Sequence, residues 1–227
     1  MTDHLLDQPI LAALTSSHGH FARHKGGAWR YDPLISPFAA VESDEPQVLH
    51  NLADLIAPGE TVVLVRSTPN VVPEGFGTLS SACVVQMLAT QHLDSPDEPR
   101  PVRLTEANEA EGYALATLTR PGPFAPQTMR MGHFWGLFKA GKLIAMAGER
   151  FRQPGWAEMS AVCVHPDHRG RGLARLLSTR VTADMQARGE APYLHCFENN
   201  AGAIALYETL GYQIRTRLHV SVVQKAP

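Results

Sequence analysis

The stretch VCVHPDHRGRGLARLL, residues 162–177, constrains the fold of this chain more than any other part. A short apolar run, typical of a buried strand, stops at Pro166 and passes into a polar turn rich in glycine and arginine. Apolar residues at helical spacing, Leu173, Leu176 and Leu177, follow at once. The stretch therefore predicts a strand, a flexible and positively charged turn, and a helix in direct succession.

The predicted turn suits an anionic ligand. A helix N-terminus presents unpaired N–H groups and about half a positive charge, and glycines let a ligand approach that backbone. Arg169, Arg171 and Arg175 add positive charge, so the turn can hold a phosphate or diphosphate; the alternative is a surface loop with solvated arginines. Two other phosphate-binding motifs are excluded, because the P-loop pattern is absent and Arg175 replaces the third glycine of GxGxxG.

The bulk composition restricts the class of partner. Hydrophobic residues make up 44% of the 227-residue chain and charged residues 19%, as in ordinary globular proteins. The net charge of -2 gives no overall attraction to nucleic acid or membrane, so we expect neither as a partner. No apolar run approaches the roughly 20 residues of a spanning helix, and the N-terminus does not resemble a secretory signal. A cytoplasmic protein is expected.

A segment rich in proline and acidic residues, 93–102, reads as a linker. It divides the chain into an N-terminal α/β region, 1–95, and a C-terminal domain, 101–227. In the first part, residues 48–57 and 79–92 have the apolar spacing of helices, and residues 61–65 form a β-branched run typical of a buried strand.

The C-terminal part alternates strand and helix patterns and predicts an α/β fold with a mixed sheet. Asn199 or Asn200 is expected to cap the last helix. The predicted strands are 102–105, a hairpin over 133–151, 157–164, 193–197 and 212–224, and the predicted helices are 106–119, 170–188 and 200–210.

Two motifs in this part resemble the GNAT superfamily of N-acetyltransferases. Residues 169–174, RGRGLA, fit its (Q/R)xxGx(G/A) signature, and residues 199–212, NNAGAIALYETLGY, are similar to its second conserved segment. The resemblance covers about residues 101–224. It implies a GNAT-like acyltransferase fold that carries the first 95 residues as an N-terminal α/β extension.

The resemblance also implies where acetyl-CoA, the donor, is held, with no metal. In such proteins it lies between two splayed parallel strands, here 157–164 and 193–197. One strand aligns the pantetheine arm, Asn200 contacts that arm, and the glycine-rich turn wraps the pyrophosphate. The implied acetyl-CoA-binding residues are Val162, Cys163, Val164, Arg169, Gly170, Arg171, Gly172, Leu173, Ala174, Arg175 and Asn200.

Three residues are candidates for proton transfer during acetylation. Tyr207 lies about two helical turns after Asn200, and in the family a tyrosine here often protonates the departing thiolate; the alternative is a tyrosine packed in the core. Glu158 is a candidate base, and strict alternation would place Glu158 and Val162 on one face unless a bulge intervenes. His195, on the opposite strand, is the rival base; either residue could instead be purely structural.

Other reactive side chains receive no catalytic or metal-binding role. His18, His20 and His24 lack partners at metal-binding spacing, so we expect a polar surface there. Cys163 and Cys196 lie in apolar strands and are expected to pack rather than react.

These observations predict an N-acetyltransferase that moves an acetyl group to a primary amine of a small molecule or peptide. The alternatives are a non-catalytic acyl-CoA-binding sensor or scaffold, and a transferase of a longer acyl group. We expect residues 1–95 to shape the acceptor side of the cleft, together with a loop near residues 120–131. Homodimers are common among the proteins it resembles, so a homodimer is possible.

Overall fold

The computed structural model describes residues 4–95 and 100–227; residues 96–99, within the predicted linker, lie outside the described residues. The strands of this part are β1 (Ala22–Lys25), β2 (Ala28–Tyr31), β3 (Phe38–Val41), β4 (Thr61–Arg66), β5 (Phe76–Ala89), β6 (Val102–Arg103), β7 (Phe134–Lys139), β8 (Lys142–Gln153), β9 (Trp156–Val164), β10 (Ala191–Phe197) and β11 (Tyr212–Lys225). They form one 11-stranded mixed sheet in the order β1-β2-β3-β4-β11-β5-β10-β9-β8-β7-β6. Within it, β3–β4 and β9–β10 are parallel pairs.

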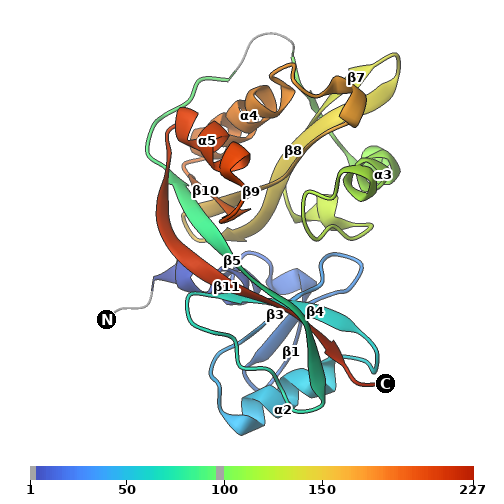
Figure 1. The fold of residues 1–227 in the computed structure, drawn as a ribbon, viewed down its shortest axis with the longest axis vertical. Helices are drawn as coiled ribbons and strands as arrows, with labels where there is room; N and C mark the ends of the chain where they lie inside the picture. Colours follow the sequence, from blue (N-terminus) through green and yellow to red (C-terminus); the bar gives the residue numbers. More distant parts are fainter. Residues whose placement is uncertain (1–3, 96–99) are drawn as a thin grey trace.

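Helices cover both faces of the sheet. The α-helices of the described part are α1 (Pro9–Leu14), α2 (Pro46–Leu55), α3 (Glu109–Thr119), α4 (Leu173–Ala187) and α5 (Ala201–Thr209). Leu177 and Val181 of α4 pack on one face of β9, whereas Leu115 of α3 packs on the other. Helix α2 covers β1–β3 in a second lobe, seen at the bottom of Figure 1.

The two long strands β5 and β11 join the lobes. They pair with each other along nearly their whole length and run diagonally from one lobe into the other (Figure 1). Strand β5 comes from the part of the chain before residue 95, yet it lies between β11 and β10 of the C-terminal part. The predicted boundary near residue 95 therefore separates two segments of one continuous sheet.

The helix predicted over residues 79–92 is wrong, because this segment is β5. An apolar run at helical spacing can also be a buried strand, and periodicity alone does not separate the two. Here Val84 and Val85 are buried, and each pairs with both neighbouring strands, β10 and β11. A short helix could not pair with these strands. The other predicted elements are confirmed, with ends shifted by a few residues.

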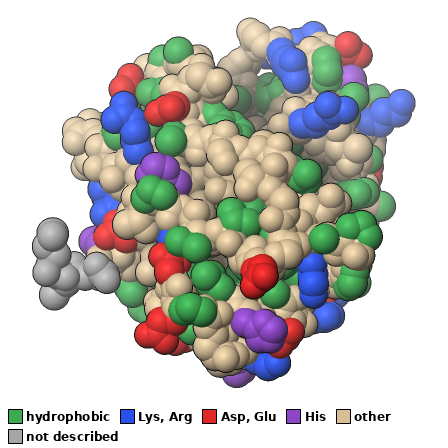
Figure 2. Space-filling view, turned by 60° about the horizontal axis from the view of Figure 1, so that its bottom comes forward, with side chains coloured by type: hydrophobic (Ala, Val, Ile, Leu, Met, Phe, Trp, Pro, Cys, Tyr) green, Lys and Arg blue, Asp and Glu red, His purple; other side chains and the backbone are tan. Residues whose placement is uncertain are grey.

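The surface has no dominant chemical character on the face shown in Figure 2, where acidic, basic and apolar side chains are interspersed. None of the described helices is long and apolar enough to cross a membrane.

Candidate functional site

The parallel strands β9 and β10 separate part of the way along their length. Their ladder runs from the pair Trp156–Ala191 to the pair Met159–Leu194 and stops there. Both strands continue, β9 to Val164 and β10 with β5 as its neighbour. An opening is therefore left at the carboxyl ends of two parallel strands, as the sequence resemblance implied.

A β-bulge lies in β9 where the strands separate. Met146 of β8 pairs with Cys163 and Gly148 pairs with Ser160, so β9 contains one extra residue at this point. Ala161 lies in this bulge and has a φ of 53°, in the left-handed region that a non-glycine residue rarely adopts. A bulge of this kind re-aims every side chain that follows it.

The bulge reverses the side-chain alternation of β9. Val162 and Val164 pack in the same cluster as Met159, on the face covered by α4. Glu158, the neighbour of Met159, points to the opposite face. Of the two alternatives that the sequence left open, the bulge therefore holds: the inserted residue places Glu158 and Val162 on opposite faces.

A cavity of about 380 Å³ lies beside the end of β9 beyond this point, and no described residue of β10 lines it. Every predicted acetyl-CoA-binding residue lines this cavity except Arg171 and Asn200. Asn200 instead caps α5, where its side chain accepts a hydrogen bond from the Ala203 N–H at 3.2 Å. The cavity is lined by Thr119, Pro121, Val162, Cys163, Val164, His168, Arg169, Gly170, Gly172, Leu173, Ala174, Arg175 and Leu206.

The glycine-rich turn leaves backbone N–H groups open to this cavity. Gly170 and Gly172 have φ of 72° and 74°, and a Cβ added at either would meet no atom within 4 Å. Gly172 is the N-cap of α4 and has no side chain to satisfy the first-turn N–H groups. The arrangement fits a diphosphate, because the first-turn N–H groups and the dipole of α4 lie beside an open space that Arg169 and Arg175 also line.

Four lining residues were missed by the sequence analysis. His168 and Leu206 are neighbours of residues already assigned, so proximity in the motifs was an available signal. Thr119 and Pro121 come from the end of α3, more than 40 residues before the glycine turn. Only the three-dimensional contact between α3 and β9 brings them to the site.

Tyr207 stands on α5 and packs against the cluster that contains Leu194 and Cys196 of β10. Burial raises the pKa of its phenol above the ordinary value of 10, and the neighbouring Cys196 raises it further. The hydroxyl makes no hydrogen bond to the residues that the structure describes. The phenol therefore stays protonated, and Tyr207 follows the cavity-lining Leu206 but does not itself line the cavity.

Cys163 lines the cavity as a thiol rather than a thiolate. Its side chain is 5% exposed, and burial raises the pKa of the thiol to about 11 although Thr119 hydrogen-bonds to it. A neutral thiol is a weak nucleophile. The geometry thus supports the packing role expected for this cysteine.

Glu158 is fully buried and is paired on two sides. Arg150 of β8 donates two hydrogen bonds to its carboxylate at 2.7 and 2.8 Å, and the His195 Nδ1 lies 2.7 Å from Oε1. The Arg150 guanidinium also stacks over Phe38 and Phe151. Burial alone would raise the pKa of Glu158, but the charge and hydrogen bonds of Arg150, with His195, lower it to about 2.

The same hydrogen-bonded row continues through β5 to β11. The Gln86 amide nitrogen donates to Leu6 O at 2.8 Å and lies 2.9 Å from His195 Nε2, while its oxygen accepts from Arg215 at 2.6 Å. Arg215, itself at a bulge of β11, also pairs with Asp7. Since the Gln86 nitrogen can only donate, His195 Nε2 accepts and Nδ1 carries the proton that reaches Glu158.

We call this row the polar ladder; it contains one residue from each of five neighbouring strands, β8, β9, β10, β5 and β11. It brings the two candidate bases, Glu158 and His195, together. It also occupies the lone pairs that a base would use. Proton uptake by either residue therefore requires a contact of the ladder to open.

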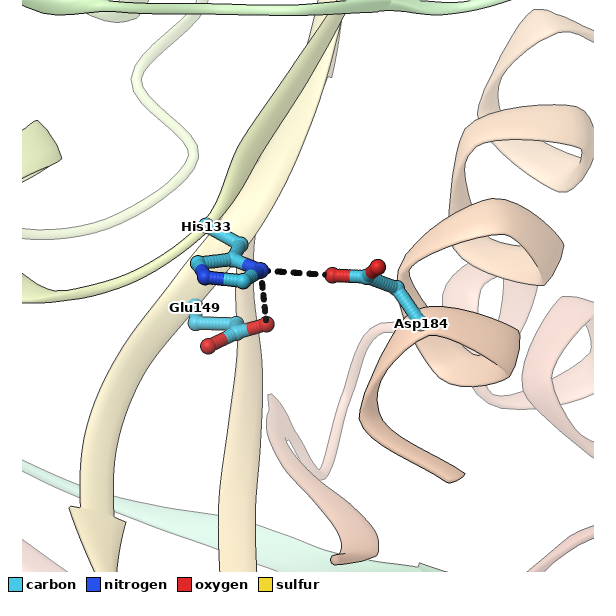
Figure 3. A group of neighbouring side chains, drawn as sticks. All are labelled: His133, Glu149 and Asp184. Carbon is cyan, nitrogen blue, oxygen red and sulfur yellow. Dashed lines mark hydrogen bonds and ion pairs between the residues drawn. The ribbon is translucent and has the colours of Figure 1, made fainter. Parts of the chain in front are cut away.

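A second polar cluster joins β8 to α4. His133, Glu149 and Asp184 converge, with ligand atoms within 4.8 Å of one another (Figure 3). Arg188 donates to both carboxylates at 2.6 Å. Its guanidinium supplies the positive charge that would otherwise be missing between the two acids, so the cluster is a complete ion-pair network.

Similar proteins point to one family. The FR47-like protein family matches residues 134–220. The crystal structure of a GNAT-family protein from Novosphingobium aromaticivorans is 40% identical, covers 99% of this chain and 100% of its own, and has a TM-score of 0.92. A GCN5-related N-acetyltransferase from Kribbella flavida, 17% identical with a TM-score of 0.66 and coverage of 98% and 96%, shares the fold.

A shorter match involves an acetyltransferase from Pectobacterium atrosepticum. It is 44% identical over 52 residues, which are 22% of this chain and 36% of that relative. The matched segment therefore spans only about a third of the relative's own length.

The Arg150–Glu158 pair predicts a strong energetic coupling. Glu158→Gln leaves the buried guanidinium without its counter-charge, and Arg150→Met leaves the carboxylate without its main partner. Each single variant is expected to lower the free energy of unfolding by about 3 kcal/mol. The loss of unfolding free energy in the double variant should be clearly smaller than the sum of the two single losses. The reason is that the second substitution removes the buried charge that the first one left without a partner.

Urea denaturation of the four proteins at pH 7 measures this coupling. Arg217→Met with Glu198→Gln is the matched control, since that pair is 74% and 46% exposed and should show no measurable coupling. Simple additivity at Arg150 and Glu158 would contradict the assignment of the pair as a buried structural unit.

Proposed function

The chain belongs to the GNAT family of acetyltransferases, and on that premise we propose that it transfers an acetyl group from acetyl-CoA to a primary amine. The observation that supports this most directly is the cavity beside the end of β9. It is lined by Val162, Cys163 and Val164 of β9 and by the glycine-arginine turn at the start of α4. Both parts of an acyl-CoA, the diphosphate and the thioester arm, have a matching environment there.

In this proposal the donor supplies an activated thioester carbonyl, and the chain positions it. The N–H groups of Leu173, Ala174 and Arg175 hold the diphosphate. The β9 backbone at Val162 and Val164, which lost its β10 partner where the strands separate, offers strand-like hydrogen bonds to the pantetheine arm. Pre-alignment of this kind converts binding energy into orientation of the reacting carbonyl.

Tyr207 is the proposed proton donor to the departing sulfur. Its raised pKa keeps the phenol protonated throughout the neutral range, and its hydroxyl is free of other partners among the described residues. A general acid of this type contributes typically 100-fold or more, up to about 10⁴-fold, to such a step.

The acceptor must attack as a neutral amine, and the polar ladder bears on which amines suit the site. A carboxylate with a pKa of about 2 is a weak base, so Glu158 serves best as the charge partner of His195. His195 Nε2 is the proposed proton acceptor, but a proton there must displace the Gln86 amide. We therefore favour acceptors with an α-amino group, whose pKa of roughly 7.7–8.0 leaves much of it neutral without a strong base.

Gly172→Asp tests the donor site. It places a side chain and a negative charge at the N-cap of α4, where the diphosphate is proposed to lie. We expect the acetyl-CoA dissociation constant, measured by calorimetry, to rise about 100-fold, equivalent to roughly 2.7 kcal/mol.

Gly189→Asp is the matched control, because Gly189 has φ of 76°, equally open space and a position at the other end of α4. It should bind acetyl-CoA within about twofold of the parent. Equal losses in both variants, or no binding by the parent, would contradict the proposed donor site.

Tyr207→Phe tests the proton donor. The assay follows release of the coenzyme thiol with a panel of amines: phenylalanine amide, the dipeptide Ala-Ala, tyramine and Nα-acetyl-lysine. For each amine that is acetylated, we expect kcat to fall by about 100-fold with little change in acetyl-CoA affinity.

Tyr212→Phe serves as its control. Tyr212 lies 6.1 Å from Tyr207 between ring centroids, but its hydroxyl bonds to Thr182 in the core. It should lose stability and keep its kcat. A Tyr207→Phe protein with the parent's kcat would remove the tyrosine from the mechanism.

A further inference from the structure

The loop of residues 120–131 connects the donor cavity to the N-terminal region. At one end, Pro121 lines the cavity. At the other end, Met131 is 3% exposed and packs in one core cluster with Leu6 and Ile10. The loop therefore runs from the cavity to the N-terminal region, which carries none of the family motifs.

Thr128 fastens the middle of this loop to the segment between β2 and β3. Its side chain is buried, donates to Ile35 O at 2.7 Å and accepts from the Ala125 N–H at 2.7 Å. The Gln127 N–H donates to Leu34 O at 2.9 Å beside it. One hydroxyl thus joins the loop to itself and to the N-terminal region.

His18 fastens the end of the loop. Its Nε2 lies 3.1 Å from Met131 O and its Nδ1 lies 2.9 Å from the Tyr31 hydroxyl. A carbonyl only accepts, so Nε2 carries the proton and Nδ1 accepts from Tyr31. Burial, with a contribution from His20, lowers the pKa of His18 to about 4, which keeps this arrangement neutral at pH 7.

The polar surface expected at His18, His20 and His24 is therefore wrong for His18, which is 2% exposed, while the other two are exposed. A histidine beside small polar residues gives no local sign of burial. Its partners, Tyr31 and Met131, lie 13 and 113 residues away.

The part of the loop nearest the cavity is not fastened in this way. Residues 121–123 are exposed, whereas Ala125, Thr128 and Met129 are buried. The backbone leaves α3 through Arg120 in the left-handed region at φ of 52° and passes Gly122 at φ of 139°. Beyond this exposed tip, the loop is held by Phe124, which packs against Phe134, and by the hydrogen bonds of Thr128.

We propose that Thr128 is a positioning residue for the acceptor amine: through its bond to Ile35, the N-terminal region holds the 120–131 loop as one wall of the acceptor side of the cleft. This rests on the proposed acetyl transfer. Loss of the hydroxyl strands a buried carbonyl and a buried N–H, and the root of the loop must then move to reach other partners.

Thr128→Val and Thr128→Ser form a matched pair. Valine keeps the shape and removes both hydrogen bonds, whereas serine keeps the hydroxyl and loses one methyl group. The readouts are acetyl-CoA affinity by calorimetry, KM and kcat for the amines of the panel above, and hydrogen exchange of the amides of Phe124, Ala125, Gln127 and Thr128. All are taken well below the melting temperature of each variant.

For Thr128→Val we expect the KM of the acetylated amine to rise about tenfold, with kcat and acetyl-CoA affinity within about twofold of the parent. Exchange at these amides should become faster. Thr128→Ser should have the KM and the hydrogen-exchange rates of the parent. This split separates positioning from general damage, which would lower kcat and acetyl-CoA affinity as well.

An unchanged KM for Thr128→Val, an equal defect in Thr128→Ser, or a parallel loss of acetyl-CoA affinity would each overturn the inference. If the parent acetylates no amine of the panel, the proposed function fails and the inference fails with it. That outcome is distinct from turnover with an unchanged KM, in which the inference alone fails.

Discussion

The polar ladder is the interaction on which the rest of the structure depends. It runs from Arg150 through Glu158, His195 and Gln86 to Arg215, one residue on each of five neighbouring strands. Each group is buried or half-buried, so an incorrect strand register would leave a charge or amide without a partner at a cost of several kcal/mol. The ladder therefore specifies the register at the one place where β5, from early in the chain, enters among the later strands.

The cavity lies beyond the point at which β9 and β10 separate. Strand β10 pairs with β5 on one edge as far as Phe197, but with β9 on the other edge only as far as Leu194. The bulge at Ala161 then turns Val162 and Val164 away from the ladder face and toward α4. Val162 and Val164 thus face away from Glu158, whereas Cys163, which also lines the cavity, lies on the face covered by α3. The N-terminal region reaches the site from the ladder face, where Leu6, Asp7 and the loop near Ile35 make their contacts.

Sequence reasoning succeeded where the determining contacts are local. The strand, glycine turn and helix around Gly172, and the Asn200 cap, depend on residues within one or two turns of each other. It failed at β5, because a run without charges is compatible with a helix or a buried strand until its neighbours are known. The ladder, the burial of His18 and the Thr128–Ile35 bond join residues from about 10 to 130 positions apart, and such pairs leave no periodic signal in one sequence.

The most direct test of the account is a crystal structure of the protein with acetyl-CoA bound. The account predicts the diphosphate within hydrogen-bond distance of the amides of Leu173 and Ala174, and the thioester between the ends of β9 and β10, facing Tyr207. The polar ladder should be unchanged by binding. A ligand bound away from the opening between these strands, or a diphosphate bound away from the start of α4, would contradict it.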